Sequence, residues 1–466
     1  MRTLAVVAAL AALFTACTEE APKVEKQKEV DNDTVNVYSH PEWAKNANIY
    51  EVNIRQYTAE GTFAAFEKHL PRLKEMGVNI LSIMPIQPIG MLNRKGGKGS
   101  YYSIRDYETV NPDFGTQEDF TKLVENAHAL GLKVILNWVA NHTAFDHTWI
   151  TNRPDFYTKD DVGFSPIVAL DNAGNSTDWT DVADLNYNER DLMDAMTESM
   201  RFWVTASNID GFRCDVAGFV PLEFWEVAIP KLKETKSDLF FLAEWEDPKL
   251  MSVFDMGYSW SFHHMMNEVA KGEKSPTLFN DYLKKLNTEF GPDNMQMMFT
   301  TNHDENSWNG TVFERMGENH KNMFVLATTF QNGMPLIYGG QEASLNKRLR
   351  FFEKDTISWK NTDLIPFYTQ MLKLKHENKA LWNGTAGGKM TLIETGKPDR
   401  VYAFYREKDE NRVVVFLNFS DQAISFEPLL IDIFGSYFSL EGNSLDWATN
   451  PQLRLEANDC LIVTKN

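Results

Sequence analysis

The chain has 466 residues, which is enough for one large domain and a smaller one. Its 65 acidic and 46 basic residues give a net charge of −19, and no cluster of basic residues interrupts that balance. This charge argues against nucleic acid as a partner, because phosphate backbones are bound by clustered Lys and Arg side chains.

The N-terminus predicts secretion followed by attachment of a lipid. Met1-Arg2 precedes an apolar run over residues 4–14, which is too short to span a membrane and is typical of a signal peptide. The run ends in Phe14-Thr15-Ala16-Cys17, which resembles a bacterial lipoprotein signal that is cleaved after residue 16 and lipidated on Cys17. The alternative is a plain signal peptide with a cleavage site nearby.

Residues 18–34 are polar and charged, so we predict a flexible tether over residues 17–40. We therefore expect a secreted lipoprotein that only a lipid anchor holds to the bacterial outer membrane, on its periplasmic or its cell-surface face. Besides Cys17, the chain has Cys214 and Cys460, and their wide separation gives no indication of a disulfide.

From residue 49 to residue 378, short apolar runs alternate with stretches of helical periodicity. The runs predict strands over residues 49–54, 78–84, 132–138, 209–215, 239–243, 253–257, 295–300 and 335–338. The stretches between them predict helices over residues 63–76, 116–130, 189–205, 222–235, 277–290, 319–331 and 365–378. About eight strand–helix units close a parallel (β/α)8 TIM barrel, whose catalytic face lies at the C-terminal ends of its strands.

Two segments depart from this alternation. Residues 141–184 read as a long loop rich in Asp, Asn, Thr and aromatic residues, and such an excursion within a regular fold is usually functional. From about residue 385, period-two runs over residues 401–406 and 412–419 predict antiparallel strands. The expected fold is therefore α/β, with a (β/α)8 barrel over residues 41–384, an inserted domain over 141–185 and a β-sandwich over 385–466.

Three carboxylates and two histidines follow predicted strands at the point where each strand ends: His142, Asp215, Glu244, His303 and Asp304. Such a set at the reactive face of a barrel is not a packing pattern. Two carboxylates that flank a bond, one as nucleophile and one as acid, are the arrangement of retaining glycoside hydrolysis. Arg213 lies on the same strand face as Asp215, where its charge keeps the carboxylate ionised. Taken alone, that pair would more simply be a structural ion pair.

The motifs that hold these residues resemble those of glycoside hydrolase family 13, the α-amylase family. Three motifs match those that carry its carboxylates: Gly211-Phe212-Arg213-Cys214-Asp215, Ala243-Glu244-Trp245 and Phe299-Thr300-Thr301-Asn302-His303-Asp304. Two more resemble the end of its inserted domain and its last barrel strand: Ala183-Asp184-Leu185-Asn186 and Gly333-Met334-Pro335-Leu336-Ile337-Tyr338-Gly339-Gly340-Gln341-Glu342. The resemblance covers residues 49–378 in the family's order, and the C-terminal β segment resembles the family's C-terminal domain.

The resemblance implies a role for each carboxylate. Asp215 would be the nucleophile and form a β-linked glycosyl-enzyme, while Glu244 would protonate the leaving oxygen and then activate water. Asp304 would bind hydroxyls of the sugar ring and favour its distorted, oxocarbenium-like state. Arg213 would keep Asp215 charged.

The resemblance also implies how the substrate is held. His142 and His303 would hydrogen-bond the sugar before the cleaved bond, and Tyr102 would stack on that sugar. A shift of one residue would give the stacking role to Tyr101 instead. Core packing is the structural alternative for either tyrosine.

Two departures from the family's pattern bear on the site. The motif after the third predicted strand normally begins with Asp, and here Asn137 removes a charge that would support Arg213. Where endo-acting amylases often carry Lys-His after the nucleophile, this chain has Gly218-Phe219. That change alters the wall beside the leaving sugar.

Calcium is the one cofactor that the resemblance suggests. Asn141 and Asp184 occupy positions that match calcium ligands in amylases, and both supply the hard oxygen donors that calcium prefers. The alternative is that both residues pin the inserted loop by hydrogen bonds alone.

We therefore expect a retaining α-glucan hydrolase that cleaves α-1,4-glucosidic bonds in starch fragments, maltooligosaccharides or the parent polysaccharide. One alternative is a family transglycosylase, in which a sugar replaces water. Another is an α-1,6-acting, neopullulanase-like enzyme, since Val216 after the nucleophile occurs in such relatives as well as in others. A surface glucan-binding lipoprotein without activity is the remaining alternative, and the three intact carboxylates argue against it.

Overall fold

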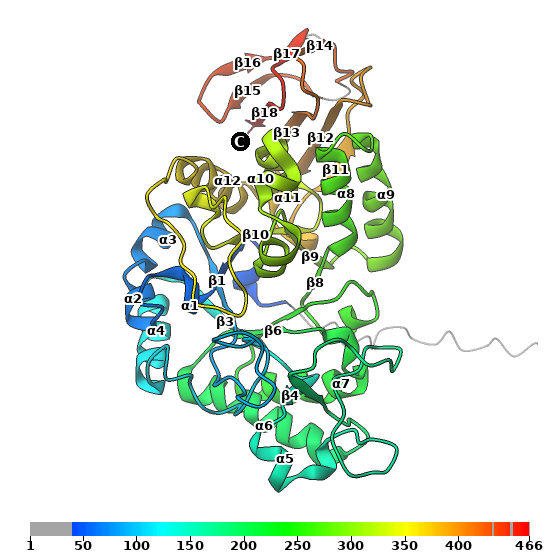
Figure 1. Cartoon of the computed structure of the whole chain (residues 1–466). Coiled ribbons are helices and arrows are strands. Elements are labelled where there is room, and N and C mark those ends of the chain that lie inside the picture. Colours follow the sequence, from blue (N-terminus) through cyan, green and yellow to red (C-terminus); the bar gives the residue numbers. More distant parts are fainter. Residues whose placement is uncertain (1–39, 431–432, 448–450, 466) are drawn as a thin grey trace, which may run out of the picture. The chain divides into compact units, whose positions relative to one another are not determined.

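A computed structural model describes residues 40–430, 433–447 and 451–465 (Figure 1). The predicted signal peptide, Cys17 and residues 17–39 of the predicted tether lie outside the described residues. Within the described ranges, no helix is long and apolar enough to cross a membrane.

Eight parallel strands of the described chain close into a barrel, which confirms the fold expected from the alternating pattern (Figure 1). In chain order they are β1 (Ile49–Val52), β2 (Ile80–Ile83), β3 (Lys133–Trp138), β6 (Gly211–Cys214), β7 (Phe240–Ala243), β8 (Met256–Tyr258), β9 (Met295–Phe299) and β10 (Gly333–Tyr338). Nearly every residue of these strands is buried, as expected for parallel strands that are covered on both faces. Because the strands run parallel, their C-terminal ends meet at one face of the barrel.

The helices of the barrel segment follow its strands in the order expected. They are α1 (Ile54–Tyr57), α2 (Phe63–Glu67), α3 (Leu70–Met76), α4 (Gln117–Ala129), α6 (Arg190–Ser207), α7 (Leu222–Thr235), α8 (Trp260–Ala270), α9 (Phe279–Lys285), α10 (Val312–Met316), α11 (His320–Thr329) and α12 (Ile365–Glu377). The single helix predicted over residues 63–76 is wrong, because Pro71 lacks an N–H donor and is accommodated in the first turn of a separate helix, α3.

Local signals set the ends of these helices. The Thr116 hydroxyl accepts a hydrogen bond from the Asp119 N–H, and the Asp119 carboxylate accepts one from the Thr116 N–H, which caps α4. Gly77 ends α3 in the left-handed conformation, with a φ of 94°. This turn returns the chain to the barrel at β2.

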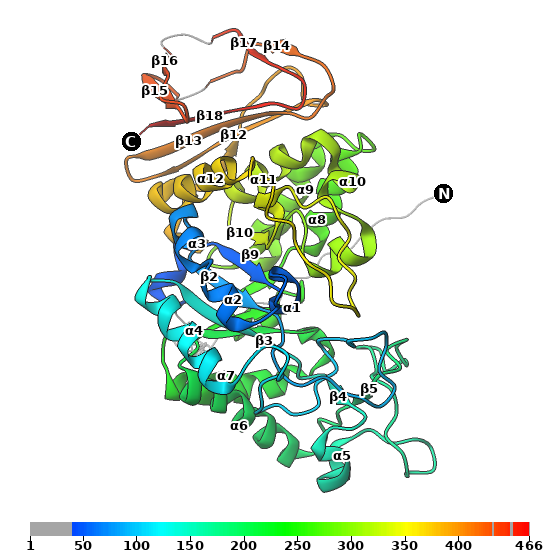
Figure 2. The ribbon, with the colours of Figure 1, turned by 60° about the vertical axis from the view of Figure 1, so that its left-hand side comes forward.

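The inserted segment between β3 and α6 contains short elements, so the prediction of a long loop is wrong in part. β4 (His142–Ala144) and β5 (Val182–Asp184) form an antiparallel pair in which His142 lies opposite Asp184 (Figure 2). The helix α5 (Thr148–Asn152) lies between them in the chain. Strands of three residues are too short to show a periodicity, which is why the segment reads as a loop.

The C-terminal segment is antiparallel, as expected. Its described strands form a six-stranded sheet in the order β11 (Lys389–Leu392), β12 (Val401–Lys408), β13 (Asn411–Asn418), β18 (Cys460–Lys465), β15 (Ser436–Ser439) and β16 (Ser444–Asp446). A separate pair is formed by β14 (Ile424–Phe426) and β17 (Leu453–Leu455). A second hydrophobic core, which includes Phe416, Phe426 and Trp447, is consistent with a β-sandwich.

The C-terminal sheet lies beside α11 and α12 of the barrel (Figures 1 and 2). The buried guanidinium of Arg406 on β12 donates hydrogen bonds to the carbonyl oxygens of Phe330, at 2.9 Å, and Trp382, at 3.0 Å. A buried cation with these backbone partners fixes the sheet against the barrel.

Candidate active site

A cavity of about 610 Å³ opens at the C-terminal ends of the barrel strands. Its size is typical of a pocket for a small molecule. Six of the seven predicted catalytic and substrate-binding residues line it: Tyr102, His142, Asp215, Glu244, His303 and Asp304. The seventh, Arg213, is buried directly beneath two of them.

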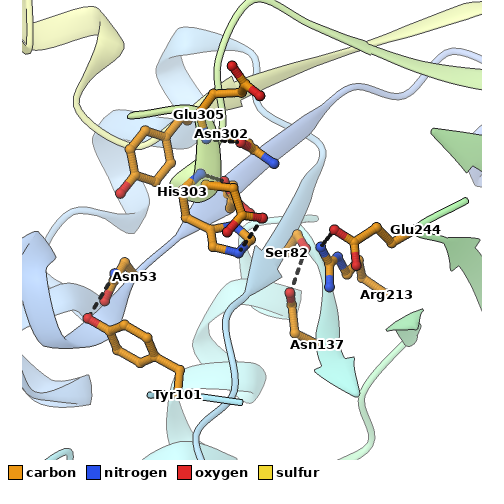
Figure 3. Close-up of polar contacts among 12 residues, drawn as sticks. Asn53, Ser82, Tyr101, Asn137, Arg213, Glu244, Asn302, His303 and Glu305 are labelled. Carbon is orange, nitrogen blue, oxygen red and sulfur yellow. Dashed lines mark hydrogen bonds and ion pairs between the residues drawn. The ribbon is translucent and has the colours of Figure 1, made fainter. Parts of the chain in front are cut away.

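Arg213 holds two carboxylates at the floor of the cavity. Its Nη1 donates a hydrogen bond of 2.7 Å to Asp215 Oδ1, and its Nη2 lies 2.6 Å from Glu244 Oε1 (Figure 3). Its Nε donates to the hydroxyl of Tyr258 on β8, at 3.1 Å. Because β6 and β7 are neighbours in the barrel, the residues that follow them meet on one guanidinium.

The turn after Asp215 fixes the position of Glu244. Val216 has a φ of 37°, in the left-handed region that β-branched residues rarely adopt, at a cost of roughly 1–3 kcal/mol. In this conformation its N–H donates a 2.8 Å hydrogen bond to Glu244 Oε2. Arg213 and the Val216 amide therefore each hold one oxygen of the Glu244 carboxylate.

The surroundings of Asp215 act on its pKa in opposite directions. Burial and the neighbouring Glu244 carboxylate raise the pKa of Asp215 to about 6, against the lowering effect of Arg213. Arg213 thus offsets only part of the effect of burial. Asp215 is ionised at neutral pH and protonated in mild acid.

His303 lies between two carboxylates. Its Nδ1 is 2.7 Å from Glu51 Oε1, and its Nε2 is 3.3 Å from Asp304 Oδ2 and 2.8 Å from the Tyr102 hydroxyl. Burial by itself would lower the pKa of His303, but Asp304 and Glu51 raise it to about 9. The ring is therefore an imidazolium at neutral pH, with both nitrogens as donors.

Glu51 is a residue of the site that sequence reasoning missed. It lies on β1, is 1% exposed, and accepts hydrogen bonds from the ring and from the N–H of His303. A glutamate inside the apolar run Ile49–Val52 was the available signal, since charged residues are rarely buried without a partner.

Tyr102, rather than Tyr101, faces the cavity. The Tyr102 ring stacks on His303 at a centroid distance of 5.4 Å. Tyr101 is 1% exposed, and its hydroxyl accepts a 3.1 Å hydrogen bond from the Asn53 amide (Figure 3). The stacking role that the resemblance implies is therefore open to Tyr102 alone of the two.

His142 presents a neutral ring to the cavity. Burial lowers the pKa of His142 to about 4. The Asn141 amide lies 3.2 Å from Nδ1 and can only donate, so Nδ1 accepts and the hydrogen of the neutral ring lies on Nε2. The backbone of Tyr102 also accepts a hydrogen bond from this ring, which fixes the ring at the wall of the cavity.

Asn137 does not leave Arg213 without partners. Its amide donates to the Ser82 hydroxyl, at 3.2 Å, and to the Ile83 carbonyl oxygen, at 2.9 Å (Figure 3). Its Oδ1 accepts a 3.3 Å hydrogen bond from the Tyr102 hydroxyl. The residue ties β2 to β3, while the charge of Arg213 is met by Asp215 and Glu244.

Phe219 forms an aromatic wall with Trp179 and Trp245, and Trp179 is the member of this wall that lines the cavity with Glu244. The Phe219 ring stacks on Trp179 at 6.0 Å and meets Trp245 edge-on at 5.3 Å. A Cβ at position 218 would lie 2.2 Å from the Trp245 ring, so only glycine lets the indole lie there. The position where amylases often carry Lys-His is thus apolar in this chain.

Asp184, one of the two residues expected to bind calcium, is engaged in hydrogen bonds within the inserted segment. Asp184 Oδ2 accepts a 2.6 Å hydrogen bond from the Thr158 hydroxyl, and Oδ1 accepts one of 2.9 Å from the Leu170 N–H. Burial raises the pKa of Asp184, and the described residues contain no group of three His, Cys, Asp or Glu side chains that could hold a metal. Calcium takes six to eight oxygen ligands, so these contacts favour the loop-pinning alternative.

Removal of divalent cations with EDTA should therefore leave the melting temperature unchanged. Thr158→Val should instead lower the free energy of unfolding by about 1–3 kcal/mol, because the largely buried Asp184 carboxylate loses a part-buried hydrogen bond. Calorimetry measures both, with Thr180→Val as an exposed control in the same segment. A melting temperature that falls by several degrees in EDTA and recovers with calcium would contradict this assignment.

The comparisons with known proteins agree with the fold. A sequence profile described as "Alpha amylase, catalytic domain" matches residues 29–380, well over half of the chain. The chain is 25% identical over 398 residues to alpha-amylase MalA of Haloarcula japonica, which covers 83% of this chain and 57% of that protein. It is 25% identical over 460 residues to alpha-1,4-glucan:maltose-1-phosphate maltosyltransferase of Picrophilus torridus, which covers 90% and 68%.

Among solved structures, the maltogenic alpha-amylase AmyB of Thermotoga neapolitana has a TM-score of 0.80 and 28% identity, over 91% of this chain and 99% of that one. The chain spans little more than half the length of MalA and nearly all of AmyB. The closed barrel and the matched profile together show that this chain belongs to the α-amylase family.

Proposed function

We propose that this chain is a retaining hydrolase that cleaves α-1,4-glucosidic bonds in maltooligosaccharides or starch fragments. The observation that carries the proposal is the pair of carboxylates, Asp215 and Glu244, held on the two ends of the Arg213 guanidinium. Retaining enzymes keep their carboxylates roughly 5 Å apart, whereas inverting enzymes leave a wider gap for water. Two carboxylates on one guanidinium favour the shorter separation.

In the first step, an Asp215 oxygen attacks the anomeric carbon of the sugar. The bond from that carbon to the leaving oxygen breaks, and Glu244 gives its proton to the leaving oxygen. The product is a β-glycosyl ester of Asp215. In the second step, Glu244 takes a proton from water, the water oxygen bonds to the anomeric carbon, and the ester bond to Asp215 breaks.

The other residues position the sugar for these steps. His142 presents its ring to the cavity, and His303 holds the Tyr102 hydroxyl and Asp304 in place beside the sugar. Asp304 lies 3.3 Å from His303 and accepts from ring hydroxyls. The Tyr102 ring offers the apolar face against which a sugar ring packs.

The pH dependence of kcat/KM should show an acid limb with a midpoint near pH 6. Below this pH, Asp215 takes up a proton and is no longer a nucleophile, so kcat/KM falls about tenfold per pH unit. Initial rates on maltoheptaose between pH 4 and 8 measure it, with circular dichroism to establish that the protein stays folded. A profile that stays flat down to pH 4 would contradict the assignment.

Transfer to a second sugar is the other candidate activity, and the aromatic wall favours it. Trp179 places an aromatic ring in the same cavity as Glu244, where an acceptor sugar could stack in place of water, and Phe219 packs behind that ring. The maltosyltransferase relative is, by its name, a transferase. Chromatography of the products from pure maltoheptaose separates the two activities, since transfer yields products longer than the substrate. Pullulan and panose in the same assay test α-1,6 cleavage.

We further propose that Cys17 carries a lipid that holds the chain to the outer membrane, on its periplasmic or cell-surface face. The support is the signal-like run over residues 4–14 and the motif that ends at Cys17. Labelled palmitate should enter the wild-type chain and not Cys17→Ser. The division into domains over residues 41–384, with 141–185 inserted, and 385–466 remains a proposal that rests on the change of sequence pattern.

A further inference from the structure

A cluster of aromatic side chains lines the cavity on the side of Tyr102 and His303. The Phe351 ring lies 6.4 Å from each of these rings and within 15° and 29° of parallel to them. Trp308 packs on Phe351 at 5.2 Å and on Phe352 at 5.7 Å, and it is 52% exposed at the rim. Under the proposed function, this cluster lies beyond the sugar that precedes the cleaved bond.

The loop over residues 94–100 ties this cluster to the rest of the cavity wall. The Gly97 N–H donates a 2.8 Å hydrogen bond to Glu353 Oε1, and the Lys98 N–H donates one of 2.8 Å to the Phe352 carbonyl oxygen. On its other flank, Lys95 Nζ lies 3.3 Å from Asp181 of the inserted segment. We call residues 94–100 and 351–353 together the strap.

Glycines and a buried arginine allow residues 94–100 to lie close to residues 351–353. A Cβ at Gly96 would lie 2.6 Å from the Phe352 Cβ, and one at Gly97 would lie 2.7 Å from Glu353 Oε2. The buried Arg55 donates to the carbonyl oxygens of Gly99, at 3.0 Å, and Phe351, at 3.3 Å. Both halves of the strap are therefore anchored to one side chain on α1.

We infer that the strap closes the non-reducing side of the site, so that the enzyme takes free non-reducing chain ends and releases short oligosaccharides. The inference rests on the proposed function, which places the sugar before the cleaved bond against Tyr102 and His303. A glucan that is cleaved in its interior must extend out of the site on both sides of the cleaved bond. Lys95 links the strap to Asp181 of the inserted segment, and Gly97 links its two halves, so the strap joins the inserted segment to the aromatic cluster along one wall of the cavity. We place the exit of the chain on the opposite side, next to Glu244.

The test compares 4-nitrophenyl maltoheptaoside with the same compound blocked by a 4,6-O-ethylidene group on its non-reducing sugar. Products are followed by chromatography, because a chain-end enzyme leaves the nitrophenyl group on the shortened chain. We expect kcat/KM for the blocked compound to be at least a hundredfold lower. Similar rates on both compounds would overturn the inference, whereas cleavage of neither would overturn the proposed function and the inference with it.

Two double variants, one in the strap and one control, test whether the strap is the part of the chain that closes the site. Lys95→Ala with Glu353→Ala removes two of the side chains that tie the loop, and should raise the blocked-to-unblocked ratio of kcat/KM at least tenfold. Lys231→Ala with Asp194→Ala removes an exposed ion pair of 2.9 Å outside the strap and should leave the ratio unchanged. An unchanged ratio in the first variant, with its fold intact by circular dichroism, would overturn the role of the strap.

Discussion

Replacing Asp215 with Asn should lower kcat/KM on maltoheptaose by about 10⁴-fold or more, the scale of loss seen when a covalent nucleophile is removed. The amide fills the same space and still accepts the hydrogen bond from Arg213, whose second carboxylate, Glu244, remains. The loss would therefore report chemistry rather than unfolding. Initial rates measure it, with unfolding curves to compare stability and the exposed Asp194→Asn on α6 as a control.

Azide distinguishes a missing nucleophile from a general defect. In Asp215→Gly, an azide nitrogen can bond to the anomeric carbon from the vacated face while Glu244 protonates the leaving oxygen. The expected product is a β-glycosyl azide. Activity of the Asn variant within tenfold of wild type, or an α-azide from the Gly variant, is incompatible with Asp215 as nucleophile.

Glu244→Gln should lower kcat/KM on maltoheptaose by about 10²–10⁴-fold, the range for loss of a general acid and base. The first step should be nearly unaffected with α-maltosyl fluoride, because fluoride leaves without a proton. The second step stays slow, because the amide takes no proton from water. Stopped-flow detection of fluoride should therefore show a burst followed by slow turnover.

The control for Glu244→Gln is Glu226→Gln, an exposed glutamate on α7. It should retain wild-type rates on both substrates. Equal losses on maltoheptaose and on the fluoride in Glu244→Gln would mean that Glu244 only supports the structure of the site.

Sequence patterns predicted the barrel because its strands are short buried runs that end in glycine, proline or polar residues. The patterns failed where a proline interrupted a continuous apolar spacing or where a strand was too short to show a period. Pro71 divides a helix whose apolar spacing is continuous, and β4 and β5 are too short for any period to appear. Helix α8 has no predicted counterpart, although Phe262, Met266 and Val269 are buried at helical spacing.

The catalytic motifs were found because each stands directly after its strand. Glu51 was not found in this way, because its partner His303 is distant in sequence. His303 follows β9, and only the closed barrel, in which β10 lies between β1 and β9, brings the two residues together. The orientation of Asn137 depends in the same way on Ser82 and Ile83 of the neighbouring strand. The Gly-rich loop over residues 94–100 was visible in the sequence, but its role depends on contacts with residues 351–353.

Peptide mapping of the trapped intermediate tests the central claim most directly. Glu244→Gln incubated with α-maltosyl fluoride, quenched in acid and digested should carry one maltosyl unit on the peptide that contains Asp215, and fragmentation should place it on that carboxylate. The added mass should be absent from Glu244→Gln combined with Asp215→Asn. A maltosyl unit on a different residue, or a product of β configuration formed without any covalent adduct, would contradict retaining hydrolysis through Asp215.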